Sequence, residues 1–210
     1  MSVVLDSAAR QSAPEVLRGR RLEYLTISWN LIEAAVALVF GAIAGSISLV
    51  GFGIDSVIEC SSAAVLLWRL RDGTNGEKRE RMALRLVGVC FLLLAVYVAA
   101  GATRSLVSQK RPEASPVGVA LAAVSLVVMP LLARAKRRVA ARLNSSALHA
   151  DSRQTDLCAL LSAILLGGLL LNALLGWWWA DPVAALLMAP IIVREGLVAL
   201  RGETCSDCHA

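Results

Sequence analysis

The sequence lacks several features that would mark a secreted, ATP-driven or multidomain protein. Its first 20 residues contain no apolar core of signal-peptide length, so we expect the first apolar segment to remain as a membrane anchor. No phosphate-binding loop is present, which argues against an ATP-driven pump. No repeat of fixed period occurs, and no connection is long enough for a second folded domain. The chemistry must therefore lie in the apolar segments or at their edges.

Apolar sequence, in contrast, is abundant. Hydrophobic residues make up 57% of the 210 residues, more than a soluble domain usually contains, and they gather in long runs. Because roughly 20 apolar residues cross a hydrocarbon core of about 30 Å, we predict six spans, near residues 23–44, 47–68, 84–103, 117–133, 156–178 and 181–199. The sequence thus predicts an all-α polytopic membrane protein. A bundle of six transmembrane helices (22–200) follows an N-terminal arm (1–21) and precedes a short tail (201–210).

The distribution of Lys and Arg predicts the orientation of this bundle. Basic residues are concentrated in the N-terminal arm and in the connections at 69–85 and 134–153, whereas "GSIS" and "WWWAD" carry none. The connection "RSLVSQKRPEASP" is a modest exception. Since cytoplasmic loops retain positive charge, we expect both termini in the cytosol and the protein in the cell (inner) membrane. The net charge of +5 then reflects topology and contact with anionic lipid headgroups, and we expect no nucleic acid as a partner.

Two carboxylates interrupt the second span, in the stretch "GFGIDSVIECSSA". Asp55 and Glu59 are four residues apart, so on a helix they point to the same side and can converge on one ligand. An ionised acid at a helix centre costs roughly 2.5–3.5 kcal/mol. We expect no Lys or Arg at mid-depth in any span, so the pair predicts a visiting cation. The alternative is that the two acids pair with buried cations or share a proton.

Other polar residues lie in or near the first and fifth spans. His149, Ser152 and Asp156 fall on one helical face at the start of the fifth span, while Asp151 and Gln154 lie off it. Oxygen ligands with one imidazole suit a divalent ion such as Zn²⁺. The first span adds two polar groups three residues apart, Asn30 and Glu33. Glu33 is interpreted either as a hydrogen-bonded acid or as a ligand or proton carrier.

The cysteines indicate little redox chemistry. Those inside the spans are expected to behave as small apolar residues. Cys205, Cys208 and His209 belong to "CSDCH", which matches the attachment pattern of c-type haem. No histidine is expected within a span core to serve as an axial ligand, so this tail is interpreted either as having no role or as a weak capture site for Zn²⁺ or Cu⁺.

The sequence has six predicted spans, with "DSVIE" in the second, "SRQTD" in the fifth and "ADPVAALLMAPIIVREGLVALRG" as the last. In these features it resembles the cation diffusion facilitator family of metal transporters, in its short form without a C-terminal cytosolic domain. The resemblance implies a four-ligand Zn²⁺ site in which Asp55, Glu59 and Asp156 match three ligand positions. Ser152 stands where the family usually has His or Asp. The fourth ligand is therefore left open, and the candidates are His149, Gln154, Asp151, a water held by Ser152, and Glu33.

The same resemblance implies a function. We expect a transporter, not an enzyme, that exports a divalent cation, most plausibly Zn²⁺, by proton-coupled alternating access. No tightly bound cofactor is expected, and a homodimer is expected by analogy. The competing interpretations are a non-transporting membrane scaffold or metal sensor, and a haem or redox protein that uses "CSDCH". One difficulty is depth, because hydropathy places Asp156 near the inner edge of its span and Asp55 well inside its own, so their depths differ by about 10 Å or more.

Overall fold

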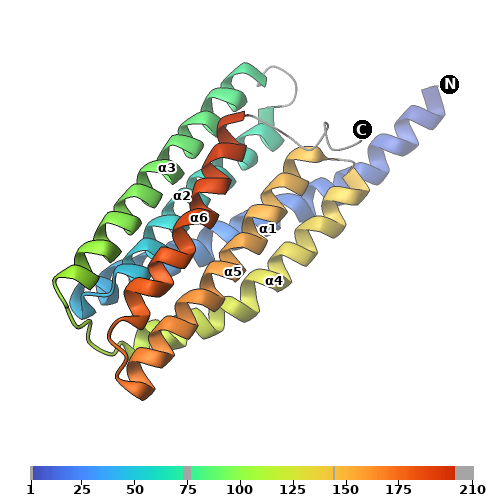
Figure 1. Ribbon diagram of the computed structural model, residues 1–210. Coiled ribbons are helices and arrows are strands. Elements are labelled where there is room, and N and C mark those ends of the chain that lie inside the picture. Colours follow the sequence, from blue (N-terminus) through green and yellow to red (C-terminus); the bar gives the residue numbers. More distant parts are fainter. Residues whose placement is uncertain (1, 73–76, 144, 202–210) are drawn as a thin grey trace.

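The computed structural model describes residues 2–72, 77–143 and 145–201, and six helices account for nearly all of them (Figure 1). They are α1 (Ser2–Ala44), α2 (Ile47–Asp72), α3 (Glu77–Val107), α4 (Pro116–Leu143), α5 (Ser146–Leu175) and α6 (Ala180–Arg201). No strand occurs within these ranges. The all-α prediction is confirmed.

The helices form one bundle in which α2 has the largest number of neighbours. The most extensive pairings are α1 with α2, α3 with α6, and α4 with α5. Further contacts join α1 to α4, α2 to α3, and α5 to α6, so that the six helices close into a ring, and α2 also packs on α5 and α6. The start of α1 and the end of α6 lie at the same end of the bundle (Figure 1). Side chains on the inner face of α2 therefore lie where most of the helices meet.

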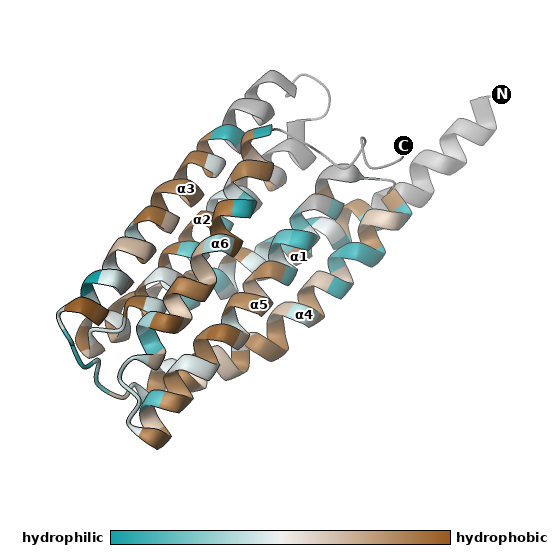
Figure 2. Ribbon diagram, in the orientation of Figure 1, coloured by the Kyte–Doolittle hydropathy of each residue, from teal (hydrophilic) through white to brown (hydrophobic). Residues whose placement is uncertain are grey.

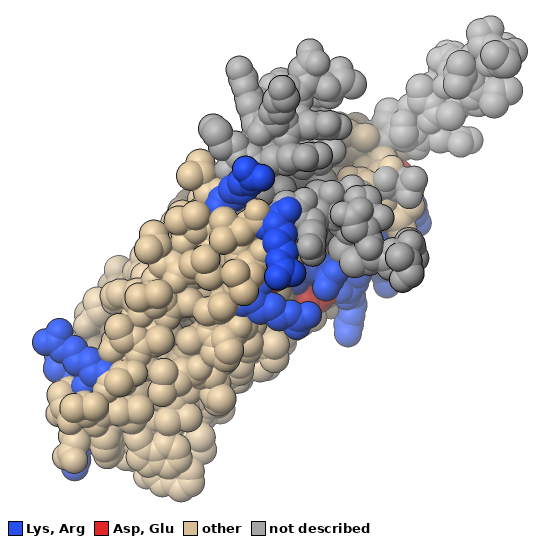
Figure 3. Space-filling model, turned by 45° about the horizontal axis from the view of Figure 1, so that its top comes forward, with Lys and Arg blue, Asp and Glu red and all other residues tan. Residues whose placement is uncertain are grey.

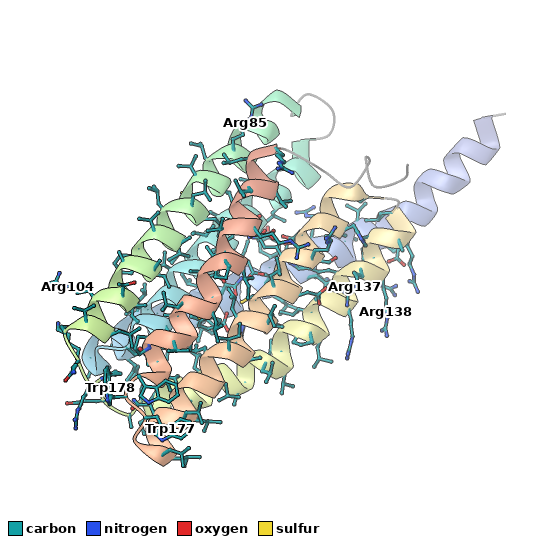
Figure 4. The ribbon with its side chains drawn as sticks, in the orientation of Figure 1. Arg85, Arg104, Arg137, Arg138, Trp177 and Trp178 are labelled. Carbon is teal, nitrogen blue, oxygen red and sulfur yellow. The ribbon has the colours of Figure 1, made fainter. Side chains whose placement is uncertain are left out.

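All six helices are long and apolar enough to cross a membrane within the described residues. Hydrophobic residues predominate along all six helices (Figure 2), and many large ones, such as Leu31, Val96 and Leu174, are exposed. On the face shown in Figure 3, Lys and Arg lie towards the two ends of the bundle, with a broad uncharged expanse between them. Arg85 lies at one end, and Arg104 lies at the other with Trp177 and Trp178 (Figure 4). This is the pattern of a helical bundle that spans a bilayer.

The helices extend beyond the apolar runs, most of all around the fourth connection. The helix α4 continues ten residues past Ala133, and α5 begins ten residues before Asp156, so the region predicted as a connection is mostly helical. Ser145 starts α5 as its N-cap, accepting a hydrogen bond from the backbone N–H of Leu148 at 3.3 Å. The charged sequence 134–143 continues α4 as an amphipathic helix. It carries Lys136 into the interior, where the ammonium group pairs with Glu23, so a residue outside the predicted fourth span supplies a buried cation that the sequence interpretation did not foresee.

Polar contacts fasten the opposite end of the bundle, where α1 turns into α2. Gly45 adopts a positive φ of 65° in this turn, a conformation that glycine adopts without strain. Asp181, at the start of α6, accepts hydrogen bonds from Ser46 Oγ at 2.5 Å, from the hydroxyl of Ser48, and from the backbone N–H of Ile47 at 3.0 Å. An acid from α6 thus caps the N-terminus of α2 and fixes these helices relative to one another.

Candidate functional site

A row of polar side chains faces inwards along α1. Glu23, Thr26, Asn30 and Glu33 follow one another at intervals of three or four residues, so they share one face of the helix. All four have no exposed surface. Since α1 packs on α2 and α4, this face forms one wall of a polar interior in a molecule whose outside is apolar.

The two acids of α2 lie in the same interior. Asp55 is 5% exposed and Glu59 is 2% exposed, as their spacing predicts. Both line a small cavity of about 10 Å³, roughly the size needed for one water molecule. Gln154 and Cys158 of α5 and Glu195 of α6 complete its polar lining, and the apolar lining comes from Phe91, Leu157, Leu161, Ile191 and Ile192. Asp55 makes no hydrogen bond with another described residue, so the contacts of the folded chain leave its carboxylate available to a ligand.

Glu33 occupies the junction of α1, α2 and α4. Its carboxylate accepts a hydrogen bond from the hydroxyl of Ser125 in α4 and a longer one, 3.4 Å, from Ser56 Oγ in α2. The sequence left two interpretations open for Glu33, a hydrogen-bonded acid or a ligand or proton carrier. These contacts correspond to the first. They join three helices at Ser56, the residue next to Asp55 in α2.

A buried ion cluster lies on the other side of α2, between α1, α4 and α5. Lys136 Nζ contacts Glu23 Oε2 at 3.3 Å and a carboxylate oxygen of Asp151, and it donates to Thr155 Oγ1 at 3.4 Å. Lys136, Glu23 and Thr155 have no exposed surface, and Asp151 has 6%. An ammonium group buried so completely is stable only when carboxylates surround it, and this cluster provides two.

One side chain joins the ion cluster to the acids of α2. Thr155 Oγ1 donates a hydrogen bond to Glu59 Oε1 at 3.1 Å, while it also accepts from Lys136. Residue 155 of α5 therefore lies at the depth of residue 59 of α2. The difference in depth expected between Asp55 and Asp156 is therefore smaller than hydropathy suggests, about one helical turn, because α5 begins well before its apolar run and places its first turns beside α2.

Three of the predicted ligands, Asp156, His149 and Ser152, make other contacts or are exposed in this conformation. The carboxylate of Asp156 contacts the guanidinium of Arg137, and both side chains are more than a third exposed. His149 is exposed, and Ser152, although buried, donates its hydroxyl to the backbone carbonyl of His149 at 2.6 Å.

Gln154 lines the cavity, and its Oε1 accepts a hydrogen bond from Ser62 at 2.9 Å. Within the described ranges, no three His, Cys, Asp or Glu side chains lie close enough together to hold a metal ion. Cys205, Cys208 and His209 lie outside those ranges. The four-ligand site stays a prediction.

Several interior residues escaped the sequence interpretation. Lys136 lies among arginines in a stretch that was predicted as a connection, and Glu23 is the first residue of the first predicted span, close to Arg20 and Arg21. Their signal was periodicity, because Ser125, Met129 and Lys136 fall on one face of α4, together with other small or apolar residues. Glu195 lies next to Arg194, and the sequence interpretation gave it no role.

Comparison with known proteins decides the family. The model of the cation efflux transmembrane domain matches residues 24–202, which is most of the chain. The chain belongs to the cation efflux family. Three similar proteins illustrate this. Transmembrane protein 163 of Xenopus laevis is 27% identical over 204 residues, an alignment that covers 94% of this chain and 73% of the relative.

An uncharacterized transporter of Synechocystis is 28% identical over 197 residues, which cover 88% of this chain and 63% of the relative. The cation-efflux pump FieF of Shewanella oneidensis is 34% identical over 110 residues, 52% of this chain and 35% of the relative. All three relatives are therefore longer than the part this chain spans. Two of these three relatives are named as a transporter and as a cation-efflux pump.

Proposed function

We propose that this protein exports a divalent metal cation, with Zn²⁺ as the favoured substrate, across the cell membrane in exchange for protons. Both termini lie in the cytosol in this proposal, and two copies associate as a dimer, as the family resemblance implies. The observation that carries the proposal is the position of Asp55 and Glu59. Both acids of α2 are buried, and both line one cavity at the centre of the bundle.

The physical case rests on what a buried carboxylate needs. An acid in a membrane interior is costly unless a cation, a proton or a set of donors compensates it. Glu33 has two hydroxyl donors and Glu23 has an ammonium group, whereas Asp55 has no partner among the described residues. Oxygen ligands from carboxylates and amides accept divalent ions, and Gln154 and Glu195 line the same cavity. A transported cation supplies the charge that Asp55 and Glu59 require.

Asp156 is the third ligand implied by the family and would have to move. It follows Thr155, which contacts Glu59, so its backbone already lies at the right depth. Its pairing with Arg137 is partly exposed, and such pairs contribute only about 0–1 kcal/mol. Release of Asp156 from Arg137, with a rotation of α5, is the rearrangement that the proposal requires for a complete site.

Coupling to protons follows from the ligands. Carboxylates bind a metal only when they are deprotonated, so protons and the metal compete for Asp55 and Glu59. Metal that enters from the cytosol displaces protons, and protons from outside displace the metal after the helices have exposed the site there. An inward proton gradient then drives export.

Transport by purified protein in liposomes tests the proposal. With a proton gradient imposed, wild type should move Zn²⁺ against its concentration gradient, and Asp55→Asn should not. Glu113→Gln is the matched control, because it neutralises an exposed acid in the loop between α3 and α4. An Asp55→Asn variant that transports Zn²⁺ at the wild-type rate contradicts the assignment.

A scaffold without transport is the second candidate, and the hydrogen bonds of Glu33 favour it, since they hold three helices together. It predicts that no divalent ion stabilises the folded protein. It also assigns no role to the carboxylate of Asp55, which has no hydrogen-bond partner among the residues that the structure describes.

A further inference from the structure

The ion cluster around Lys136 contains more carboxylate than its single ammonium group can satisfy. Glu23 and Asp151 each place one oxygen on Nζ, and Glu59 reaches it through the hydroxyl of Thr155. The second oxygen of each of these three acids, Glu23 Oε1, Asp151 Oδ1 and Glu59 Oε2, is buried and has no hydrogen-bond partner among the described residues. Three acids therefore share one resident cation.

The position of this cation relative to the cavity is informative. Only the hydroxyl of Thr155 separates Lys136 Nζ from Glu59, at 3.4 Å on one side and 3.1 Å on the other. Glu59 in turn lines the cavity with Asp55. The ammonium group thus lies one polar atom away from a carboxylate that, in the proposed function, releases its metal once in every transport cycle.

We propose that Lys136 acts as a substitute cation in the return step of the transport cycle. After the metal has left, the ammonium group shifts from Asp151 towards Glu59 and neutralises it, which allows the empty site to reorient. Protons neutralise the carboxylates that the ammonium group does not reach. This inference rests on the proposed function and assigns Lys136 a role in positioning charge, without contact to the metal.

The side chain suits such a movement. A lysine carries a compact charge on a flexible four-carbon stem with three donors that rotate freely, whereas the planar fork of an arginine binds one carboxylate in a fixed geometry. Lys136 contacts acceptors on α1 and α5, and Glu59 of α2 lies on the far side of the Thr155 hydroxyl, so a short shift of the ammonium group exchanges one carboxylate for another. The ammonium group is buried both beside Asp151 and beside Glu59. Removing it would therefore leave a buried carboxylate without a cation before and after the shift.

Comparison of two transport modes tests the role. Net uphill transport requires the empty site to return, but exchange of labelled for unlabelled Zn²⁺ across the membrane does not. In proteoliposomes we expect Lys136→Met to lower net transport by more than about tenfold while exchange stays within about twofold of wild type. Lys136→Arg keeps the charge and should restore part of the net transport. The matched control, Lys110→Met, neutralises an exposed lysine in a loop and should change neither mode.

A second variant covers the case in which Lys136→Met does not fold. The double variant Lys136→Met with Glu23→Gln removes one carboxylate together with the ammonium group. It should likewise lose net transport and keep the exchange of labelled for unlabelled Zn²⁺. Equal loss of net transport and exchange in the folded variants would show that Lys136 only supports the structure, and unchanged net transport would show that the return step does not need it. A wild type that performs neither mode would instead overturn the proposed function itself.

Discussion

Asp181 offers a direct test of how the end of the bundle opposite the ion cluster is held. Replacing it with alanine removes the acceptor for Ser46 Oγ, Ser48 Oγ and the backbone N–H of Ile47, all of which are wholly or partly buried. Hydrogen bonds in membrane bundles average about 0.6 kcal/mol, and those to charged acceptors in proteins reach about 1.5 kcal/mol or more. Three such bonds give an expected loss of about 2–4 kcal/mol in the free energy of unfolding.

The measurement is the unfolding free energy of purified protein in micelles, titrated with a denaturing detergent. Asp181→Asn should lose about half as much as Asp181→Ala, because the amide keeps one acceptor oxygen but not the charge. Glu113→Gln is the control at the same end of the bundle, where an exposed acid should matter by less than about 0.5 kcal/mol. The reasoning is refuted if Asp181→Ala unfolds like wild type, or if the asparagine variant is the less stable of the two.

Three further predictions follow from other contacts. Gly88→Ala should destabilise the bundle by about 1–3 kcal/mol in the same titration, because a Cβ atom there would lie 2.8 Å from the backbone oxygen of Gly196 in α6; an unchanged midpoint would contradict the α3–α6 packing. Arg137→Met should cost less than about 1 kcal/mol of stability and, by freeing Asp156, should tighten Zn²⁺ binding in a calorimetric titration; weaker binding would oppose a ligand role for Asp156. Thermal stabilisation by Zn²⁺ should grow from about pH 5.5 to about pH 7.5, because protons compete for the carboxylates; stabilisation that grows as the pH falls would exclude those ligands.

The sequence predicted the helices well and their ends poorly. Six apolar runs predicted six spans, and the structure has six helices within the described residues. A span predicted from hydropathy ends at the first cluster of charged residues, however. The prediction therefore missed the last third of α4 and the first third of α5. A helix with one face in water and the other against protein can continue through charged sequence. Its arginines lie on the exposed face, and the residues of the buried face recur between them with the helical period.

The same reason explains what was found and missed in the interior. Asp55 and Glu59 stood out because they interrupt an apolar run, and both are buried as expected. Lys136 sits among arginines in a charged stretch. The helical period places it on the same face as Ser125 and Met129, but only the packing of α4 against α1 and α5 shows that this face points inwards. The contact of Asp156 with Arg137 likewise depends on the pairing of α4 with α5, which a single sequence does not reveal.

The stabilisation of purified protein by divalent ions tests the central claim most directly. A ligand present at 100 times its dissociation constant should add about 2.7 kcal/mol to the stability of the folded state. Zn²⁺ should therefore raise the thermal midpoint of wild type and of Glu113→Gln, and it should leave Asp55→Asn and Glu59→Gln unchanged. Equal stabilisation of all four proteins, or of none by any divalent ion tested, would contradict a metal site built on the two acids of α2.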